Sequence, residues 1–397
     1  MTSPALTKET APAAPVTGGR VVGDLDVSVV MPCLNESESV ASCVRQAARW
    51  IERSGVSGEV LVVDNGSTDG SLYLAEAAGA RVIFEEERGY GAACIRGLQE
   101  ARGSYVIMGD ADGTYDFEQL DPILQLLESE AEIVLGNRLT GALERGAMPF
   151  LHRTIGTPAI SFLLGLFTGS HVGDSQCGLR GIRKDAFLRL GLKAKGMEFA
   201  SEMLFKAARL NLHVAEVPIR YRCRAGESKL NTFRDGWRHL RWLFLNSPTY
   251  AFVVPGVIFL ALGLFSLAVT LLQGHGIKIG SLRWQPVFAG TIFLVVGTNA
   301  VLLGLVSKLF ATTRGHQEED WLVRTYRRFL GFEGLLLLGA FLMAVGLAVD
   351  GLILVRWLLD PSLSEMLRLA AVGQTLLIVG ANLAFGSVAA AVADNEG

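Results

Sequence analysis

The chain has 397 residues, which is enough for one α/β domain followed by a membrane region. Its mean hydropathy is +0.37 and half of its residues are hydrophobic, with the apolar runs concentrated after residue 247. The net charge of −3 excludes a general nucleic-acid-binding function, which needs a basic surface. Five cysteines without a Cys-x-x-Cys pair fit a reducing compartment and offer no zinc site.

Residues 1–24 open the chain with a segment rich in Ala, Pro and Thr and without the apolar core of a signal peptide. We expect a disordered lead-in that stays in the cytoplasm. From residue 27 onward, short apolar runs alternate with helical patterns. The runs are 27–31, 60–63, 81–84, 105–108 and 133–135, and the helical segments lie near 37–53, 70–78, 90–102 and 117–128. This alternation predicts an α/β fold with a mostly parallel, Rossmann-like sheet.

Ligands of such sheets bind beyond the carboxyl ends of the strands, where this chain carries polar segments. The first strand runs into Pro32-Cys33-Leu34-Asn35-Glu36, and the second into Asp64-Asn65-Gly66-Ser67-Thr68-Asp69. We expect Asp64 at the top of the sheet, where its carboxylate can accept hydrogen bonds from a base or a ribose. Taken by itself, the second segment is equally a good turn with a helix cap.

The third strand is followed by Glu87-Arg88-Gly89-Tyr90-Gly91, which opens a helix. Its glycines and its cation suit a phosphate near a helix N-terminus. A dinucleotide-binding fingerprint is excluded, because the third glycine is missing and the segment follows the third strand rather than the first.

The fourth strand runs into Gly109-Asp110-Ala111-Asp112-Gly113. Residues i and i+2 of an extended backbone project to the same side, so we expect the carboxylates of Asp110 and Asp112 to converge. Such a pair repels unless a cation lies between its members, and oxygen ligands suit Mg²⁺ or Mn²⁺. A cation of this kind commonly bridges protein carboxylates and a substrate diphosphate. The segment therefore predicts a metal and diphosphate site.

These segments together resemble the family 2 glycosyltransferases with the GT-A fold, and most of all the polyprenyl- (dolichol-) phosphate mannosyl- and glucosyltransferases. The resemblance covers roughly residues 26–232. It is carried by segments in the family's order, namely those at 29–36, 62–69 and 110–112, then Asp174-Ser175-Gln176-Cys177-Gly178-Leu179-Arg180, then 222–230, which is similar to Arg-x-x-Gly-x-Ser-Lys.

The resemblance implies a set of site residues. For the nucleotide-sugar these are Pro32, Asn35, Glu36, Asp64, Ser67, Asp69, Arg88, Gly89, Asp110, Ala111 and Asp112. For the acceptor phosphate they are Arg138, Arg153, Thr157, Arg222, Arg224, Ser228 and Lys229, because arginine forks match phosphate oxygens. We expect Asp110, Asp112, Arg138 and Glu202 to be catalytic, although Glu202 could equally be a solvated helix charge.

One departure from the family pattern affects the metal. The family often places Gln two residues after the second Asp, where this chain has Thr114. We therefore add Gln176 to Asp110 and Asp112 as an expected ligand of Mg²⁺ or Mn²⁺, with Asp116 as an alternative.

Four apolar stretches follow, 250–272, 286–309, 331–355 and 369–392, each long enough to cross a bilayer core of about 20 residues. The loop between the second and third is the most basic, with Lys308, Arg314, Arg324, Arg327 and Arg328. The positive-inside rule predicts that this loop, the catalytic domain and the C-terminus are cytoplasmic, at the plasma membrane if the source is bacterial.

Residues 230–245 predict a basic amphipathic helix in the membrane interface. Leu230, Phe233, Trp237, Leu240 and Phe244 share one helical face. The alternative is a helix packed on the globular core. The expected organisation is thus a lead-in (1–24), a GT-A catalytic domain (25–228), an interfacial helix (229–247) and a four-helix membrane region (248–393).

The resemblance implies an inverting transfer of a hexose from a nucleotide-sugar to polyprenyl phosphate. UDP-glucose is the favoured donor, because the segment Gln176-Cys177-Gly178 is closer to the glucosyl branch, and GDP-mannose is second. One alternative is a processive polysaccharide synthase, whose Gln-x-x-Arg-Trp is nearly matched by residues 238–242. Another is an inactive, transferase-like membrane scaffold. The oligomeric state stays open, a homo-oligomer included.

Overall fold

The computed structural model describes residues 25–226, 232–272, 277–279, 282–284, 286–313, 319–359 and 366–395. The chain divides into two compact units, Met1–Leu240 and Arg241–Gly397. The expected lead-in and the predicted acceptor residues Ser228 and Lys229 lie outside the described residues.

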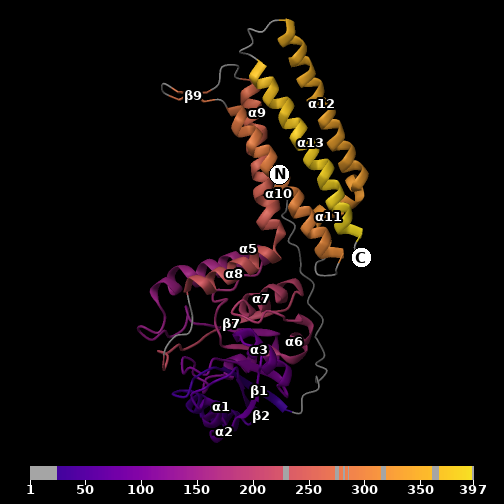
Figure 1. The fold of residues 1–397 in the computed structure, drawn as a ribbon. Helices are drawn as coiled ribbons and strands as arrows, with labels where there is room; N and C mark the ends of the chain where they lie inside the picture. Colours follow the sequence, from indigo (N-terminus) through magenta and orange to yellow (C-terminus); the bar gives the residue numbers. More distant parts are fainter. Residues whose placement is uncertain are drawn as a thin grey trace, which may run out of the picture. The chain divides into compact units, whose positions relative to one another are not determined.

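A seven-stranded sheet forms the centre of the first unit (Figure 1). Its strands are β1 (Leu25–Cys33), β2 (Gly58–Asp64), β3 (Arg81–Phe84), β4 (Gly103–Met108), β5 (Ile133–Asn137), β6 (Arg180–Arg183) and β7 (Val214–Pro218). They lie in the order β3-β2-β1-β4-β6-β5-β7, and only β6 runs antiparallel to its neighbours. The predicted mostly parallel sheet is confirmed, and the five predicted runs became β1 to β5.

Helices cover both faces of this sheet. The helices up to residue 246 are α1 (Val40–Ser54), α2 (Ser71–Ala77), α3 (Tyr90–Glu100), α4 (Asp121–Ser129), η1 (His152–Gly156), α5 (Thr157–Thr168), α6 (Lys184–Leu190), α7 (Phe199–Arg209) and α8 (Thr232–Asn246), of which α1 to α4 and α6 pack on the strands. The boundary between the two units falls inside α8, after Leu240.

Alternation along β1 sorts its side chains between two packing layers. Val29 and Met31 belong to the cluster that α1 and α4 complete, in which Trp50 is fully buried. Val30 points to the other face, where a Cβ added at Gly97 of α3 would lie 2.3 Å from its methyl group. A fully buried side chain of this size contributes about 1.5–3 kcal/mol, so the two layers fix the positions of the strand ends.

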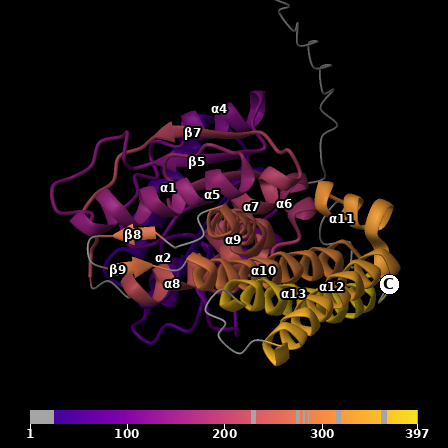
Figure 2. The ribbon, with the colours of Figure 1, turned by 90° about the horizontal axis from the view of Figure 1, so that it is seen from above.

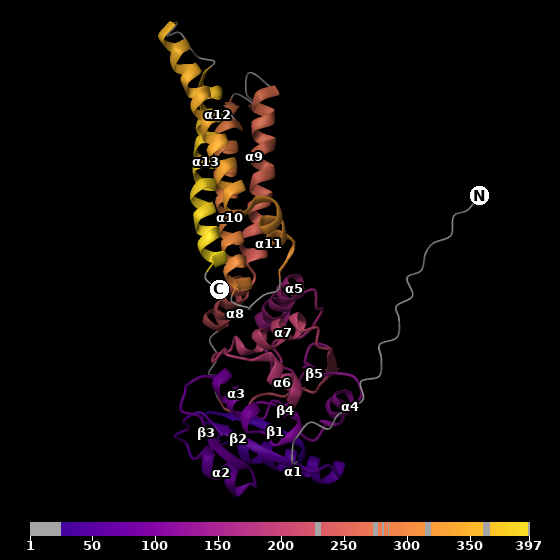
Figure 3. The ribbon, with the colours of Figure 1, turned by 90° about the vertical axis from the view of Figure 1, so that its right-hand side faces the viewer.

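Among its described residues, the second unit contains four helices that are long and apolar enough to cross a membrane, which confirms the predicted spans. Its elements are η2 (Thr249–Val253), α9 (Val254–Leu272), β8 (Ile277–Ile279), β9 (Leu282–Trp284), α10 (Pro286–Thr313), α11 (Trp321–Thr325), η3 (Tyr326–Leu330), α12 (Gly331–Leu359) and α13 (Met366–Asn395). In this unit α10 packs against α9 and α13, and α13 against α12 (Figures 2 and 3).

Small residues allow these long helices to approach one another closely. A Cβ at Gly339 of α12 would lie 2.6 Å from the carbonyl oxygen of Gly380 of α13, and the reverse distance is the same. Gly346 faces Gly373 in the same way. Since lipid gives no hydrophobic advantage to helix association, close backbone packing of this kind is what holds membrane helices together.

Candidate active site

The candidate site lies where β1, β2 and β4 end side by side. The strand order changes direction at β1, because the chain moves outward from β1 to β2 and β3 and then returns to place β4 on its other side. Sheets of this kind hold their ligands at such a switch point. Asp64 is the last residue of β2, and Asp110 follows the end of β4 by two residues.

Residues 110–113 form a turn rather than the extended segment that we expected. β4 ends at Met108, and Gly113 adopts a φ of 82°, which favours glycine. The carboxylate of Asp112 accepts hydrogen bonds from the backbone N–H of Thr114 (3.0 Å) and from its hydroxyl (2.6 Å). Thr114, the departure from the family pattern, therefore holds Asp112 in place through two hydrogen bonds.

Asp110 and Asp112 interact electrostatically across this turn. Burial, and then the negative charge of Asp112, raise the pKa of Asp110 from 3.8 to about 7, although Tyr90, Arg224 and Arg138 act in the opposite direction. A pair of carboxylates that share a site and repel each other is a good ligand for a divalent cation. We call Asp110 to Gly113 the acidic turn.

The segment 221–225 lies beside the acidic turn. The backbone N–H of Arg222 donates to the carbonyl of Thr114, and that of Ala225 to the carbonyl of Asp112. The guanidinium of Arg224 lies 2.5 Å from a carboxylate oxygen of Glu36, and its Nε lies 3.7 Å from Asp112. Arg224, predicted for the acceptor phosphate, thus lies among residues that we predicted for the donor.

Arg138 follows β5 and is buried, with 8% of its surface exposed. Its guanidinium forms a two-bond pair with Asp174, at 2.7 and 2.8 Å, and packs over the ring of Tyr221. Burial by itself lowers the pKa of Arg138, but the pairing with Asp174 outweighs it and the pKa is raised. A permanent positive charge is therefore held close enough to act on Asp110.

The two loops predicted to hold the nucleoside are joined to each other. Asn35 has a φ of 52°, its N–H donates to the Ser67 hydroxyl at 2.8 Å, and its side chain accepts from Thr68. The carboxylate of Asp64 accepts from the backbone N–H groups of Gly66 and Ser67.

Asp69 has a similar place in these loops, because it accepts from the N–H groups of Ser37 and Ser71. Burial by itself raises the pKa of Asp69, but the hydrogen bonds from the Ser71 hydroxyl and from these two N–H groups together outweigh it and hold the pKa well below its usual range. These contacts show how the loops keep their shape. At the ends of the strands, Pro32 of β1 lies beside Val63 of β2, and the carbonyl of Ala111, after β4, accepts a hydrogen bond from the Ser39 hydroxyl.

Gly89 and Arg88 have structural partners that the sequence did not reveal. Gly89 has a φ of 149°, and a Cβ there would lie 2.1 Å from the carbonyl oxygen of Lys195. The Arg88 guanidinium donates to the carbonyls of Asn65 and Gly66. The glycine expected for close approach of a phosphate is thus required by close approach of the loop at 194–196.

Glu202 lies in α7 and is buried, with 3% of its surface exposed. Its carboxylate accepts from the N–H groups of Lys193 and Ala194 at 2.7 to 3.1 Å and pairs with Lys206 at 2.8 Å. This arrangement holds the 193–196 loop against the start of α3. The expectation of a solvated charge is therefore wrong, because Glu202 is buried, whereas its catalytic role stays a prediction beside the loop-anchoring role that these contacts indicate.

The other predicted residues are spread around the acidic turn. The Gln176 amide donates to the hydroxyls of Ser175 and Ser201, so its contacts are with serines. Arg153 lies exposed in η1, and Thr157 is buried at the start of α5. Tyr90 and Gly178 were not predicted as site residues, but both contact Asp110. The Tyr90 hydroxyl forms a hydrogen bond with its carboxylate, and Gly178 packs against the carboxylate. Both lie in sequence segments that we had marked for other reasons.

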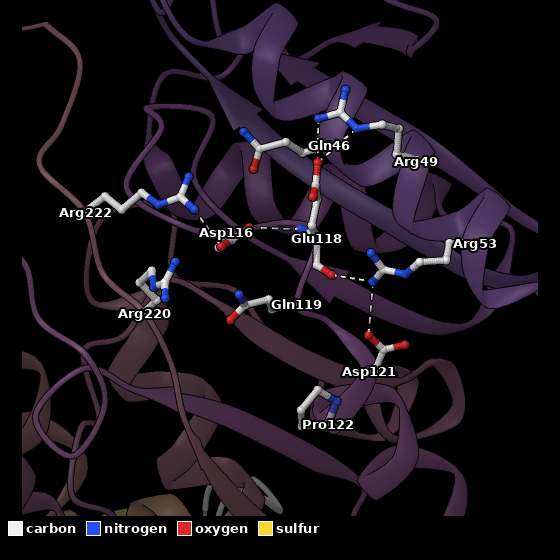
Figure 4. A pocket seen from close by; sticks show the side chains of 10 residues that line it. All are labelled: Gln46, Arg49, Arg53, Asp116, Glu118, Gln119, Asp121, Pro122, Arg220 and Arg222. Carbon is white, nitrogen blue, oxygen red and sulfur yellow. Dashed lines mark hydrogen bonds and ion pairs between the residues drawn. The ribbon is translucent and has the colours of Figure 1, made fainter.

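A cavity of about 810 Å³ opens behind Arg222 (Figure 4). Arg222 pairs with Asp116 at 2.7 Å on one side of it, and Arg49 of α1 pairs with Glu118. The cavity is lined by Gln46, Arg49, Arg53, Asp116, Glu118, Gln119, Asp121, Pro122, Arg220 and Arg222. It is distinct from the acidic turn, because none of the residues 110–113 line it.

The fold and the acidic turn define an α/β enzyme whose site lies at a topological switch point, in a chain with four membrane-length helices. The sequence model of glycosyl transferase family 2 matches residues 28–191, and that of the glycosyltransferase family 2 C-terminal transmembrane region matches residues 305–394.

Known proteins agree with these matches. The chain is 34% identical over 366 residues to the low-salt glycan biosynthesis hexosyltransferase Agl6 of Haloferax volcanii, covering 91% of this chain and 87% of that protein. It is 34% identical over 211 residues to a dolichyl-phosphate hexose transferase of the same organism, covering 53% and 89%. The structure of glucosyl-3-phosphoglycerate synthase from Mycobacterium tuberculosis, with Mn²⁺, UDP-glucose and phosphoglyceric acid, aligns with a TM-score of 0.45 at 22% identity, covering 56% and 79%.

The chain therefore belongs to glycosyltransferase family 2. It is an integral membrane glycosyltransferase, and the expected GT-A catalytic domain followed by membrane helices is confirmed.

Proposed function

We propose that this enzyme transfers a hexose, with glucose favoured over mannose, from a nucleotide-sugar to a polyprenyl phosphate on the cytoplasmic face of the membrane. The observation that carries the proposal is the pair of carboxylates Asp110 and Asp112 after the end of β4, with the guanidinium groups of Arg224 and Arg138 acting on it. Such a group of charges suits a diphosphate and a second phosphate in one site. Agl6 is named a hexosyltransferase, and the second relative a dolichyl-phosphate hexose transferase, which supports the acceptor.

The carboxylate pair fits Mg²⁺ or Mn²⁺ as a two-ligand protein site. Among the described residues, no group of three or more His, Cys, Asp or Glu side chains could hold a metal ion. Asp110 and Asp112 would then be the main protein ligands, because diphosphate oxygens and water can complete the coordination of such cations. The bound cation would neutralise charge that develops on the departing nucleoside diphosphate.

The side chains of this enzyme then have positioning and electrostatic tasks. The acceptor phosphate is already an anion, so its attack on the anomeric carbon needs no strong general base. Arg224, next to Glu36 and Asp112, is placed to bind diphosphate oxygens, and Arg138 is held rigidly by Asp174. Fixed positive charges of this kind favour the transition state because they need no reorganisation during reaction. Direct attack inverts the anomeric configuration.

The segment η1–α5 suits a lipid acceptor. Phe150, Ile155 and Phe162 are exposed by 79, 59 and 70%, with Ile155 and Phe162 close to two helical turns apart and Arg153 between Phe150 and Ile155. An apolar helical face with a cation is typical of helices that lie in a membrane interface. We propose that Arg153 and Thr157 meet the phosphate of a lipid whose chain stays in the membrane.

The test is incubation of membranes that contain the protein with polyprenyl phosphate and a panel of labelled nucleotide-sugars. We expect label from UDP-glucose, or from GDP-mannose as the second choice, in the organic phase. EDTA should abolish the transfer, and Mg²⁺ or Mn²⁺ should restore it. Absence of lipid-linked label with every donor would contradict the proposal.

Asp112→Asn provides the matching variant. Removal of its charge should lower the transfer rate by at least about 100-fold, since electrostatic groups at such sites contribute this much. Asp185→Asn in α6, where the carboxylate is 44% exposed, makes the same chemical change away from the site and should leave the rate unchanged. Full transfer by Asp112→Asn would show that the acidic turn has no catalytic role, and no transfer by the wild type would favour the inactive scaffold.

The polysaccharide synthase alternative depends on residues 238–242, which nearly match Gln-x-x-Arg-Trp. His239 of that segment is buried and forms a hydrogen bond with Ser201 of α7. The segment therefore has a structural role, as part of α8. We therefore propose transfer of one sugar per lipid. Chromatography of the lipid product tests this, because a polymerase would give a ladder of lengths.

A further inference from the structure

The loop at 174–178 positions both kinds of charge in the candidate site. Asp174 is fully buried and holds the Arg138 guanidinium in a two-bond pair. At the other end, the Gly178 N–H donates to the Tyr115 hydroxyl at 2.8 Å, and a Cβ at Gly178 would lie 2.5 Å from the Asp110 carboxylate. A shift of this loop would therefore move Arg138 and Asp110 together.

Two side chains, Gln176 of this loop and Arg180 of β6, connect the loop to the first turn of α7. Arg180 is almost fully buried and donates to the carbonyls of Ser175 and Cys177 at 2.7 Å, and to that of Ala200 at 3.0 Å. Gln176 donates to the Ser201 hydroxyl at 3.4 Å. Because a buried polar group that loses its partner destabilises the fold, these hydrogen bonds oppose separation of the loop from this turn.

α8 reaches the same turn through one buried side chain. His239 is 5% exposed, and its Nδ1 lies 2.9 Å from the Ser201 hydroxyl, the same hydroxyl that Gln176 contacts. Trp237, two residues earlier, is 63% exposed. Burial lowers the pKa of His239 to about 4, so the imidazole is neutral at physiological pH and can keep this hydrogen bond without a counter-charge.

We propose that His239 is a positioning residue of the transfer reaction, which acts through Ser201 to fix the loop at 174–178, and with it Arg138 and Asp110, relative to α8. The proposal rests on the proposed function for the roles of Arg138 and Asp110. Because α8 precedes η2 and the first membrane-length helix in the chain, the contact joins the charges of the site to the helix that comes before the membrane region in sequence. This explains why a histidine is buried on a helix whose other side chains include exposed Trp237.

The test uses the full chain in lipid nanodiscs with polyprenyl phosphate and the donor that the wild type accepts. His239→Leu removes the hydrogen bond, and His239→Asn keeps an amide that can bond to Ser201. Ser201→Ala removes the partner by a change small enough to preserve the fold. His213→Leu is the control, because His213 is an exposed histidine at the start of β7. The measurements are kcat, KM for the lipid, nucleotide Kd and melting temperature.

We expect His239→Leu and Ser201→Ala each to lower kcat by about tenfold, while the nucleotide Kd stays within twofold, because misplacement of charged groups costs rate before binding. The double variant should be no slower than either single variant, since both remove one bond. His239→Asn should recover most of the rate, and His213→Leu should match the wild type.

Two results would overturn the proposal. An unchanged kcat in Ser201→Ala and His239→Leu would show that the bond does not position the site. A loss of nucleotide affinity and melting temperature in step with kcat, without rescue by His239→Asn, would show a purely structural role. Failure of the wild type to make lipid-linked sugar would instead overturn the proposed function itself, so the two failures are distinguishable.

Discussion

At the scale of single residues, the acidic turn depends on neighbours that carry no charge. Thr114 replaces the glutamine that is frequent in the family, and both its N–H and its hydroxyl bind Asp112. Gly113 supplies the positive φ that closes the turn, and Gly178 leaves room for the Asp110 carboxylate. The geometry of the carboxylates is therefore set by the small residues around them.

Gly178→Ala tests this arrangement. The added methyl group would lie 2.5 Å from Asp110 and 2.9 Å from the Tyr115 hydroxyl, so the carboxylate has to move. We expect kcat to fall by about tenfold or more, because displacements near 1 Å at a reacting centre cost up to about 100-fold. Gly79→Ala is the control, since Gly79 has a φ of 100° but open space around it, and it should cost about 1–3 kcal/mol of stability without loss of kcat. A fully active Gly178→Ala would show that the turn tolerates the shift.

Glu202→Gln separates the two roles considered for Glu202. If the carboxylate anchors the loop at 193–196, as its bonds to Lys193 and Ala194 indicate, the variant should lose about 1.5–3 kcal/mol of stability and keep its kcat. Thermal melting and steady-state rates measure both quantities. Glu128→Gln, an exposed change on α4, is the control. A loss of kcat at unchanged melting temperature would restore the catalytic interpretation.

At the scale of elements, a charge network joins β1, β2 and β3 near their N-terminal ends, whereas the site lies at the carboxyl ends of the strands. Glu59 of β2 accepts from Ser28 of β1, from the Arg81 guanidinium of β3 and from the N–H of Arg102. Burial by itself raises the pKa of Glu59, but Arg81, Arg102 and Ser28 outweigh it and lower the pKa below 4.5. The folded state therefore binds fewer protons at this group than the unfolded state does.

The pH dependence of stability follows from that sign. The contribution of Glu59 is present above its unfolded pKa near 4.5 and is lost as the pH falls through its lower folded value. Glu59→Gln should thus melt lower than the wild type at pH 7, by the equivalent of about 1–3 kcal/mol. The difference should shrink as the pH falls below 4.5, which melting curves across pH will measure. A difference independent of pH would show that the lost packing, and not the charge, is responsible.

How much of each element the sequence predicted depends on its local pattern. The runs that became β1 to β5 were visible because they are apolar and bounded by turns, while β6 (Arg180–Arg183) was not, since it begins and ends with arginine. Arg180 is nevertheless almost fully buried, because three backbone carbonyls accept its N–H groups. No local pattern distinguishes such an arginine from one on the surface.

At the scale of the whole molecule, the chain combines a catalytic unit with four membrane-length helices. The basic residues between the second and third spans predict that this region and the catalytic unit are on the same, cytoplasmic side. In the second unit, Lys308 and Arg327 pair with Asp320 and Asp394, so part of this charge is neutralised within the structure. Orientation then depends on the basic residues that stay in water.

Cysteine labelling in sealed vesicles tests the orientation. Native Cys223 is exposed in the catalytic unit, and Thr325→Cys would place a thiol at the basic region. Both should react with an impermeant maleimide from the same side, whereas Leu272→Cys and Leu359→Cys, at the far ends of α9 and α12, should react from the opposite side. Labelling of Cys223 and Thr325→Cys from different sides would contradict the predicted topology.

The sequence by itself determined the alternation of strands and helices, the acidic pair at the end of the fourth strand and the four membrane-length helices. Each of these depends on a periodicity or a spacing within a few residues, which is local information. The tertiary structure alone decided which charges meet. Arg224 pairs with Glu36 across 188 residues, Glu202 anchors a loop, and His239 reaches Ser201. The physical reason is that strand order and helix packing bring distant side chains together, and local patterns do not record that order.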